Sequence, residues 1–163
     1  MTTDRRDASL TALIAIAIPE PLRAHLYAHA RRSFPAECCG YLTGAAANTV
    51  DGMIECRNAH TDGLHPTTPD RGEESAFVIG GRELIAFARS FDTSSPARVV
   101  YHSHTNGRAY FSSVDREVAT VDNQPTYPVQ HLVIGLDQDR VIEAAQFAWN
   151  DTEWIEVARW QVE

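Results

Sequence analysis

The stretch YHSHTNGRAYFSSVD, residues 101–115, contains two histidines one residue apart and an aspartate eleven residues after the second. The apolar residues 99–100 before them are typical of a buried strand, in which side chains at i and i+2 point to the same face. His102 and His104 are therefore expected to present two imidazoles to one point at a strand end, while Ser103 faces away. Open sheets often carry their functional sites at such ends.

A third donor follows in the next element. Residues 113–120, SVDREVAT, predict the start of a helix, and Asp115 lies in its first turn, from where its carboxylate can reach back to the histidines. Two histidines and one aspartate are typical protein ligands of a catalytic zinc site, which leaves a fourth position to water and lowers the pKa of that water toward ~7. The spacing Ser112-x-x-Asp115 also forms a capping box at a helix N-terminus. The stretch by itself therefore fits either a metal site or an ordinary junction of strand and helix.

The segment FPAECCGYLTG, residues 34–44, adds a candidate proton carrier. Glu37 stands at the start of an apolar strand, and Gly40 and Gly44 within that strand allow neighbouring backbone to approach closely. A hydrolase needs a group that accepts a proton from water and a group that donates one to the leaving amine, and a single carboxylate near the metal can do both. Glu37 is the acidic residue best placed for this role, although a glutamate also occurs at ordinary junctions of loop and strand.

Composition narrows the class of protein. The chain has 163 residues, 44% of them hydrophobic, with a formal net charge of −8, which fits one soluble domain and argues against a general binder of nucleic acid or anionic membranes. Three cysteines, two of them adjacent, do not form a disulfide framework and indicate a reducing compartment. The apolar run at residues 12–18 is too short to span a bilayer and lacks a cleavage site after it. A cytoplasmic location is the expectation.

Periodicity along the chain predicts helices that alternate with strands, and therefore an α/β fold with a mixed sheet flanked by helices. Residues 1–9 are expected to form a disordered tail, and residues 10–163 one domain without an internal repeat. The helices are expected at residues 21–34, 82–91 and from 113 onward, and the strands at residues 14–18, 37–44, 50–58, 97–104, 130–136, 141–149 and 153–162.

Three residues near the candidate site have a second interpretation. Cys38 and Cys39 flank Glu37 and could supply a thiol nucleophile or a metal ligand, but small buried residues are the commoner role of free cysteines. Arg108 lies between His104 and Ser112 and could meet a carboxylate of a substrate, or it could be a solvated loop arginine.

Two further groups of histidines lie elsewhere in the chain. His25 and His29 are one helical turn apart, a spacing that can bind metal, but no third donor follows nearby and we expect them on the surface. Residues 60–75 are rich in Pro, Gly, Thr and Asp and predict a long surface loop. That loop could act as a lid or substrate clamp, and His60 and His65 within it could be extra ligands.

The two segments, in this order, resemble the signature of the JAMM (MPN+) metalloproteases. Glu37 is followed by CCGYLTG, and the later spacing His102-x-His104-x7-Ser112-x2-Asp115 matches the family pattern in full. CRNAH, AFVIGGRELIAF and YPVQHLVIGL resemble further segments of the family, so the resemblance covers most of the chain. Phe111 stands where the family often has proline, a departure that touches no catalytic position. The chain is most similar to small stand-alone bacterial members, among them the CysO-cysteine peptidases.

The resemblance implies a role for each residue of the motif. His102, His104 and Asp115 would bind Zn²⁺, Glu37 would be the general acid and base, and Ser112 would donate a hydrogen bond to the oxyanion of the tetrahedral intermediate. The implied fold is the JAMM/MPN fold, a mixed sheet with helices that is similar to the cytidine deaminases.

The resemblance also implies a substrate. It would be a peptide or isopeptide bond after the C-terminal Gly-Gly tail of a ubiquitin-like sulfur-carrier protein, with cysteine or a short extension released. A thin tail of this kind can lie extended beside a sheet edge. The particular carrier and the pathway it serves stay open, and a homodimer is possible.

Two other functions compete with this hypothesis. The first is a non-catalytic MPN-type module that binds a partner, although members of that kind usually lack some of the ligands that are complete in this chain. The second is a zinc amidohydrolase for small molecules, which lacks support because the chain has neither the H-x-E nor the P-C-x-x-C signature of the zinc deaminases.

Overall fold

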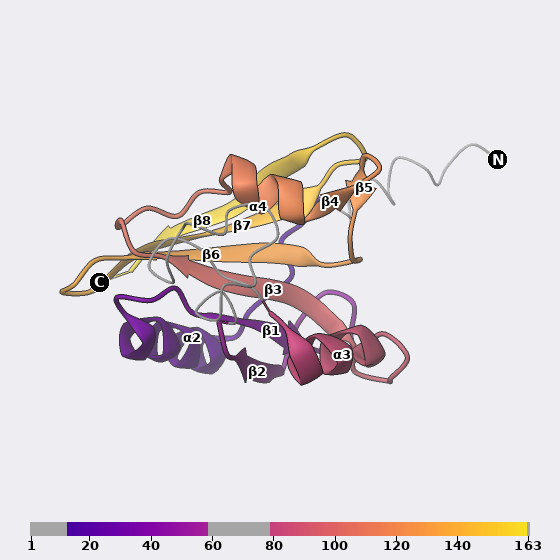
Figure 1. Ribbon diagram of the computed structural model, residues 1–163, viewed down its shortest axis with the longest axis horizontal. Coiled ribbons are helices and arrows are strands. Elements are labelled where there is room, and N and C mark those ends of the chain that lie inside the picture. Colours follow the sequence, from indigo (N-terminus) through magenta and orange to yellow (C-terminus); the bar gives the residue numbers. More distant parts are fainter. Residues whose placement is uncertain (1–12, 59–78, 163) are drawn as a thin grey trace.

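A computed structural model describes residues 13–58 and 79–162 of the chain (Figure 1). The predicted tail at residues 1–9 and the predicted loop at residues 60–75 lie outside these ranges. No helix among the described residues is long and apolar enough to cross a membrane. The elements, in chain order, are α2 (Glu20–Ser33), β1 (Cys39–Thr43), β2 (Gly52–Cys56), α3 (Gly81–Ser90), β3 (Ala97–His104), α4 (Ser113–Val118), β4 (Thr120–Val121), β5 (Gln124–Pro125), β6 (Gln130–Leu136), β7 (Val141–Trp149) and β8 (Trp154–Gln161).

Six of the strands form one sheet in the order β2-β1-β3-β6-β7-β8. The pair β3–β6 is parallel and the other neighbours are antiparallel, so the sheet is mixed, as predicted. β3 is a central strand and is buried along nearly its whole length. Its carboxyl end, which carries His102 and His104, therefore lies in the middle of the sheet and not at an exposed edge.

Helix α2 covers one face of the sheet. The sequence places Leu22, Leu26 and Ala30 on one side of this helix at four-residue spacing, and the last two are fully buried. They pack against strand residues such as Tyr101 and Ile134, which share that face of the sheet. Proline in the first turn suits a helix start, because the missing N–H has no partner there in any helix.

Helices α3 and α4 flank the opposite face, in two separate clusters. Phe87 of α3 packs with Cys39, Tyr41 and Val100, which belong to β1 and β3. The segment around α4 covers the other half of the sheet through a cluster that includes Phe111. Figure 1 shows α4 beside β6–β8 and α3 near β1 and β2. The histidines of β3 lie on the face shared by α3 and α4.

Two predicted elements differ from the structure. The expected strand at residues 14–18 forms one isolated bridge, between Ala17 and Thr49, because the side chain of Gln130 takes up the backbone polar groups that a neighbouring strand would pair. The helix expected at residues 82–91 forms as α3, but most of its apolar side chains are exposed. Phe87 is buried, while Leu84 is 38% and Ile85 53% exposed, because the helix contacts the sheet through little more than that one ring.

Candidate metal centre

The carboxyl end of strand β3 brings two imidazoles together. His102 and His104 occupy alternate positions of the strand, so both side chains point to the face that carries α3 and α4. Their Nε2 atoms are 3.2 Å apart, and both residues are buried. Ser103 faces away, as predicted, and its Oγ accepts a hydrogen bond from the backbone N–H of Cys38 at 2.7 Å.

Asp115 reaches the two histidines because a capping box holds it. Ser112 is the N-cap of α4: its Oγ accepts from the N–H of Asp115 at 3.0 Å, while Oδ2 of Asp115 accepts from the N–H of Ser112 at 2.9 Å. The same Oδ2 atom lies 3.2 Å from the Nε2 atoms of both His102 and His104. The capping box predicted from this spacing is confirmed, and it aims the carboxylate at the histidines.

The three donor atoms form a nearly equilateral triangle, whose edges are all 3.2 Å. Ligand atoms about 2.0–2.1 Å from a tetrahedral zinc ion are separated from one another by about 3.3–3.4 Å. The triangle therefore matches one face of a zinc coordination tetrahedron. Nitrogen and carboxylate oxygen are also ligands that zinc accepts, so His102, His104 and Asp115 fit this metal.

Glu37 lies beside the same point. One carboxylate oxygen of Glu37 and one nitrogen each of His102 and His104 lie within 4.8 Å of one another, a group that could hold a metal ion by itself. Glu37 is buried, at 3% exposure, and neighbours fix its backbone. Its carbonyl accepts a hydrogen bond from Nδ2 of Asn58 at 3.2 Å, and the next residue is bound through both backbone groups to Ser103.

Charge in the cluster favours a cation. Burial, the largest influence, raises the pKa of Asp115, but the two imidazoles together outweigh it and hold this pKa well below its usual range. Burial lowers the pKa of His102, yet the carboxylates of Asp115 and Glu37 together reverse the sign, and this pKa is raised. The pKa of His104 is lowered, mainly by burial. The carboxylate of Asp115 is therefore held in its ionised form next to the two imidazoles.

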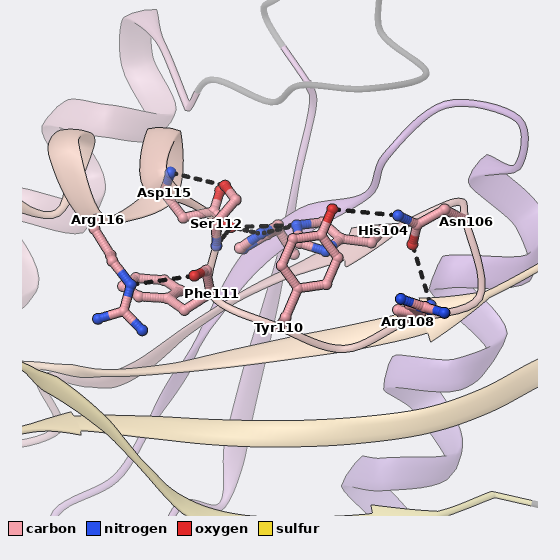
Figure 2. A network of polar contacts seen from close by, with 9 residues as sticks. His104, Asn106, Arg108, Tyr110, Phe111, Ser112, Asp115 and Arg116 are labelled. Atoms are coloured by element: carbon pink, nitrogen blue, oxygen red, sulfur yellow. Dashed lines mark hydrogen bonds and ion pairs between the residues drawn. The ribbon is translucent and has the colours of Figure 1, made fainter.

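Two residues next to the donors carried no signal in the sequence. The ring of Tyr110 lies against that of His104, with centroids 4.5 Å apart, and is 42% exposed (Figure 2). Its hydroxyl accepts a hydrogen bond from Nδ2 of Asn106 at 3.2 Å. Neither residue belongs to a spacing with a known chemical meaning, so their position depends on how the loop after β3 folds.

The other candidates lie outside the donor cluster. Burial raises the pKa of the Cys38 thiol to about 12 and raises that of Cys39 as well, so neither is poised as a thiolate nucleophile. Arg108 is exposed on the loop after β3. His25 is exposed, as expected, but the expectation for His29 is wrong: this side chain is 7% exposed. Its place on the inner face of α2 explains the burial.

Comparison with solved structures identifies the fold. A solution structure of a protein from Desulfitobacterium hafniense superimposes with a TM-score of 0.58 at 22% identity, over 85% of this chain and 87% of that one. A second, from Salinibacter ruber, gives 0.55 at 18% identity, over 85% and 86%. At these identities the likeness shows a shared fold and no more.

Comparison with protein families identifies the class. Residues 19–151 match the model described as prokaryotic homologs of the JAB domain, so the chain belongs to this family, the JAB/MPN family that its motif predicts. It is 31% identical over 96 residues to the CysO-cysteine peptidases of Mycobacterium tuberculosis and Mycobacterium bovis. The aligned part covers 58% of this chain and 59% of each relative, less than two thirds of their length.

Proposed function

We propose that this protein is a zinc-dependent peptidase of the JAMM type, which hydrolyses the bond after the C-terminal Gly-Gly tail of a ubiquitin-like sulfur-carrier protein. The observation that carries the proposal is the triangle of His102, His104 and Asp115 donor atoms, with edges of 3.2 Å, and the buried Glu37 beside it. A module that only binds a partner has no need of a complete, buried donor set with an acid next to it. Buried free thiols further favour a reducing compartment such as the cytoplasm.

In this proposal His102, His104 and Asp115 hold the metal. When bound, zinc supplies a Lewis acid that polarises a carbonyl group and makes water acidic enough to act as a nucleophile near neutral pH. The protein keeps these ligands in place through the strand and the capping box. Because Asp115 is fixed by the backbone of Ser112, it needs no reorientation when the metal arrives.

Glu37 moves the proton. Hydrolysis forms a bond between the oxygen of water and the carbonyl carbon and breaks the bond from that carbon to nitrogen. Glu37 accepts the proton that the attacking water loses and gives it to the leaving nitrogen, so one carboxylate serves as base and then as acid. The hydrogen bond from Asn58 to the Glu37 carbonyl and the bonds of Ser103 to the next residue keep this carboxylate at the cluster.

Ser112 stabilises the charge that forms on the substrate oxygen. Its hydroxyl oxygen accepts from the N–H of Asp115, which leaves the hydroxyl hydrogen available as a donor. A donor of this kind, fixed in advance, contributes about 3 kcal/mol to transition-state stabilisation in other hydrolases. The capping box thus orients both a metal ligand and an oxyanion donor.

The choice of substrate is supported by the likeness to the mycobacterial CysO-cysteine peptidases. Two terminal glycines give a tail without side chains, which can approach a buried centre in an extended conformation. Among residues 13–58 and 79–162, β2 is the edge strand of the sheet on the side of Glu37, where an extended chain would add by strand pairing. Release of cysteine or of a short extension would follow from cleavage after the second glycine.

The test combines metal content with cleavage. Wild type, His104→Ala and His25→Ala are purified without chelators, their zinc is measured by elemental analysis, and each is incubated with a small carrier protein extended beyond its Gly-Gly. We expect about one zinc per chain and cleavage after the second glycine in wild type and in His25→Ala, and loss of both in His104→Ala. Wild type that binds no zinc and gains no activity when zinc is added would contradict the proposal.

A further inference from the structure

The loop between β3 and α4 folds back over the sheet. Residues 105–112 leave the strand at His104 and lie against β6, the parallel neighbour of β3. Contact there is close: a Cβ added to Gly135 would lie 2.5 Å from the carbonyl carbon of Arg108 and 2.8 Å from the nitrogen of Ala109. Real side chains do not tolerate such distances, so the absence of a side chain at Gly135 lets the loop rest on the sheet.

Strand register connects the donor histidines to two charged residues on the outer strands. His104 pairs with Gly135 of β6, which in turn pairs with Glu143 of β7. The row that starts at His102 leads through β6 and β7 to Arg159 of β8. Directly paired residues point to the same face of a sheet. Glu143 and Arg159 therefore lie on the face of the metal donors, two and three strands away from β3.

These two charged residues hold both backbone groups of Ala109. The N–H of Ala109 donates to Oε2 of Glu143 at 2.9 Å, and its carbonyl accepts from Nη2 of Arg159 at 2.6 Å. Arg159 also forms an ion pair with Glu143 itself, and another with Glu156 at 2.7 Å. Ala109 is buried, at 1% exposure. Glu143 and Arg159 thus fix the backbone of one loop residue, and Glu156 holds Arg159 in place.

The backbone is also held two residues later. Nε of Arg116 donates to the carbonyl of Phe111 at 3.2 Å, as Figure 2 shows. Tyr110 lies between the two fixed positions, with its ring against His104, and Ser112 follows directly. The position of both residues relative to the donors is therefore determined by contacts made at Ala109 and Phe111.

We propose that Arg159 and Glu143 are positioning residues for the metal centre. By holding the peptide groups of Ala109 they place Tyr110 against His104 and bring Ser112 to the N-cap of α4. Neither residue touches the donor atoms, so each acts through the loop. The kinetic consequence rests on the proposed function, whereas the geometry at His104 does not depend on any substrate.

The experiment compares Arg159→Ala with Arg98→Ala. Arg98 is a matched control, since its guanidinium also donates to backbone carbonyls, those of Gly44 and Ala45, but at the opposite end of β3. Cleavage kinetics, unfolding in urea, and the visible spectrum of the protein loaded with Co²⁺ in place of zinc are measured for both. We expect Arg159→Ala to lower kcat tenfold or more with KM within about twofold, and to change the Co²⁺ spectrum. Arg98→Ala is expected to keep wild-type kcat and spectrum.

Two additional measurements separate positioning from loss of folding. Guanidinium ion at low, non-denaturing concentration can occupy the space left by the Arg159 side chain, and we expect it to restore part of the kcat of Arg159→Ala. The milder variant Arg159→Lys keeps the charge but loses the planar set of guanidinium donors. It should fold like wild type, with a kcat between those of wild type and Arg159→Ala. Equal kcat values and equal Co²⁺ spectra for Arg159→Ala and Arg98→Ala would overturn the proposal. If wild type cleaves no carrier protein, the proposed function fails, and the Co²⁺ spectra alone decide about Arg159.

Discussion

Two pairs of histidines in this chain have a spacing that can bind metal, and the structure treats them differently. His102 and His104 lie on a central strand, point to one face and meet the carboxylate of Asp115 at 3.2 Å. His25 and His29 lie one turn apart on α2. His25 is exposed, whereas His29 is buried and its Nδ1 is hydrogen-bonded to the hydroxyl of Tyr101 at 2.7 Å. Spacing therefore indicates which donors can converge, but a site also needs a third donor on the same side.

The difference follows from the surroundings of each pair. On β3, the neighbouring element turns back and brings Asp115 and Ser112 to the histidines, while Glu37 arrives from the start of β1. On α2, the buried histidine faces the sheet and its partner faces solvent, so no single point is shared by both. The different roles of the two histidine pairs can be tested separately, and the tests follow in order of decreasing expected effect.

The largest effect is expected from a substitution beside the β3 histidines that leaves the proposed metal ligands unchanged. Glu37→Gln keeps the size of the side chain but removes the carboxylate that we propose accepts and donates the proton. We expect kcat for carrier cleavage to fall by about 10²–10⁴ while bound zinc stays near one per chain. Steady-state kinetics and elemental analysis on the same preparation check this. Activity within a few fold of wild type would show that another group moves the proton.

A smaller effect is expected on the pH dependence of zinc binding. In the metal-free protein the pKa of His102 is raised, because the carboxylates of Asp115 and Glu37 outweigh burial, while that of His104 is lowered. A ligand must be deprotonated, so zinc displaces a proton from His102 at any pH below its pKa. Zinc affinity, measured by competition with a chelator, should rise about tenfold per pH unit below that pKa and level off above it. Affinity that does not change between about pH 6 and 8 would contradict the assignment.

The smallest effect is expected at the α2 pair. His29→Leu removes the partner of the buried Tyr101 hydroxyl, which should lower the free energy of unfolding by about 1–3 kcal/mol without changing zinc content. His25→Leu, on the exposed side of the same helix, should change it by less than about 0.5 kcal/mol. Urea unfolding of both variants measures this. Loss of zinc in His29→Leu at unchanged stability would mean that α2 contributes to the centre.

Much of the fold could be predicted because burial and periodicity are local properties of the chain. Strands β3, β6 and β7 are apolar runs that read as buried strands from their composition, and α2 has its apolar side chains at four-residue spacing. The prediction of a strand at residues 14–18 was wrong because the decisive contact is not local but comes from a residue far away in the chain. Large and small side chains alternate in this segment as regularly as in a true strand. The side chain of Gln130, more than a hundred residues later, forms hydrogen bonds with the N–H of Ile16 and the carbonyl of Ile14, in place of a neighbouring strand.

The donors of the candidate site were likewise accessible from the sequence. The i, i+2 spacing of His102 and His104 on a strand fixes their common face, and the capping-box spacing fixes where Asp115 points. Both are consequences of backbone geometry within a single element, and they need no knowledge of the rest of the chain.

What the sequence by itself determined is thus the set of donors and the elements that carry them. The tertiary structure alone decided which groups surround these donors: Tyr110 against His104, Asn58 at the backbone of Glu37, and the hold of Glu143 and Arg159 on Ala109. Tyr110 and His104 are close in the chain, but the other contacts join residues 21 to 50 positions apart, through strand register and a loop that folds back on the sheet. Side-chain spacing is set by the chain itself, whereas such contacts exist only once separate strands have paired.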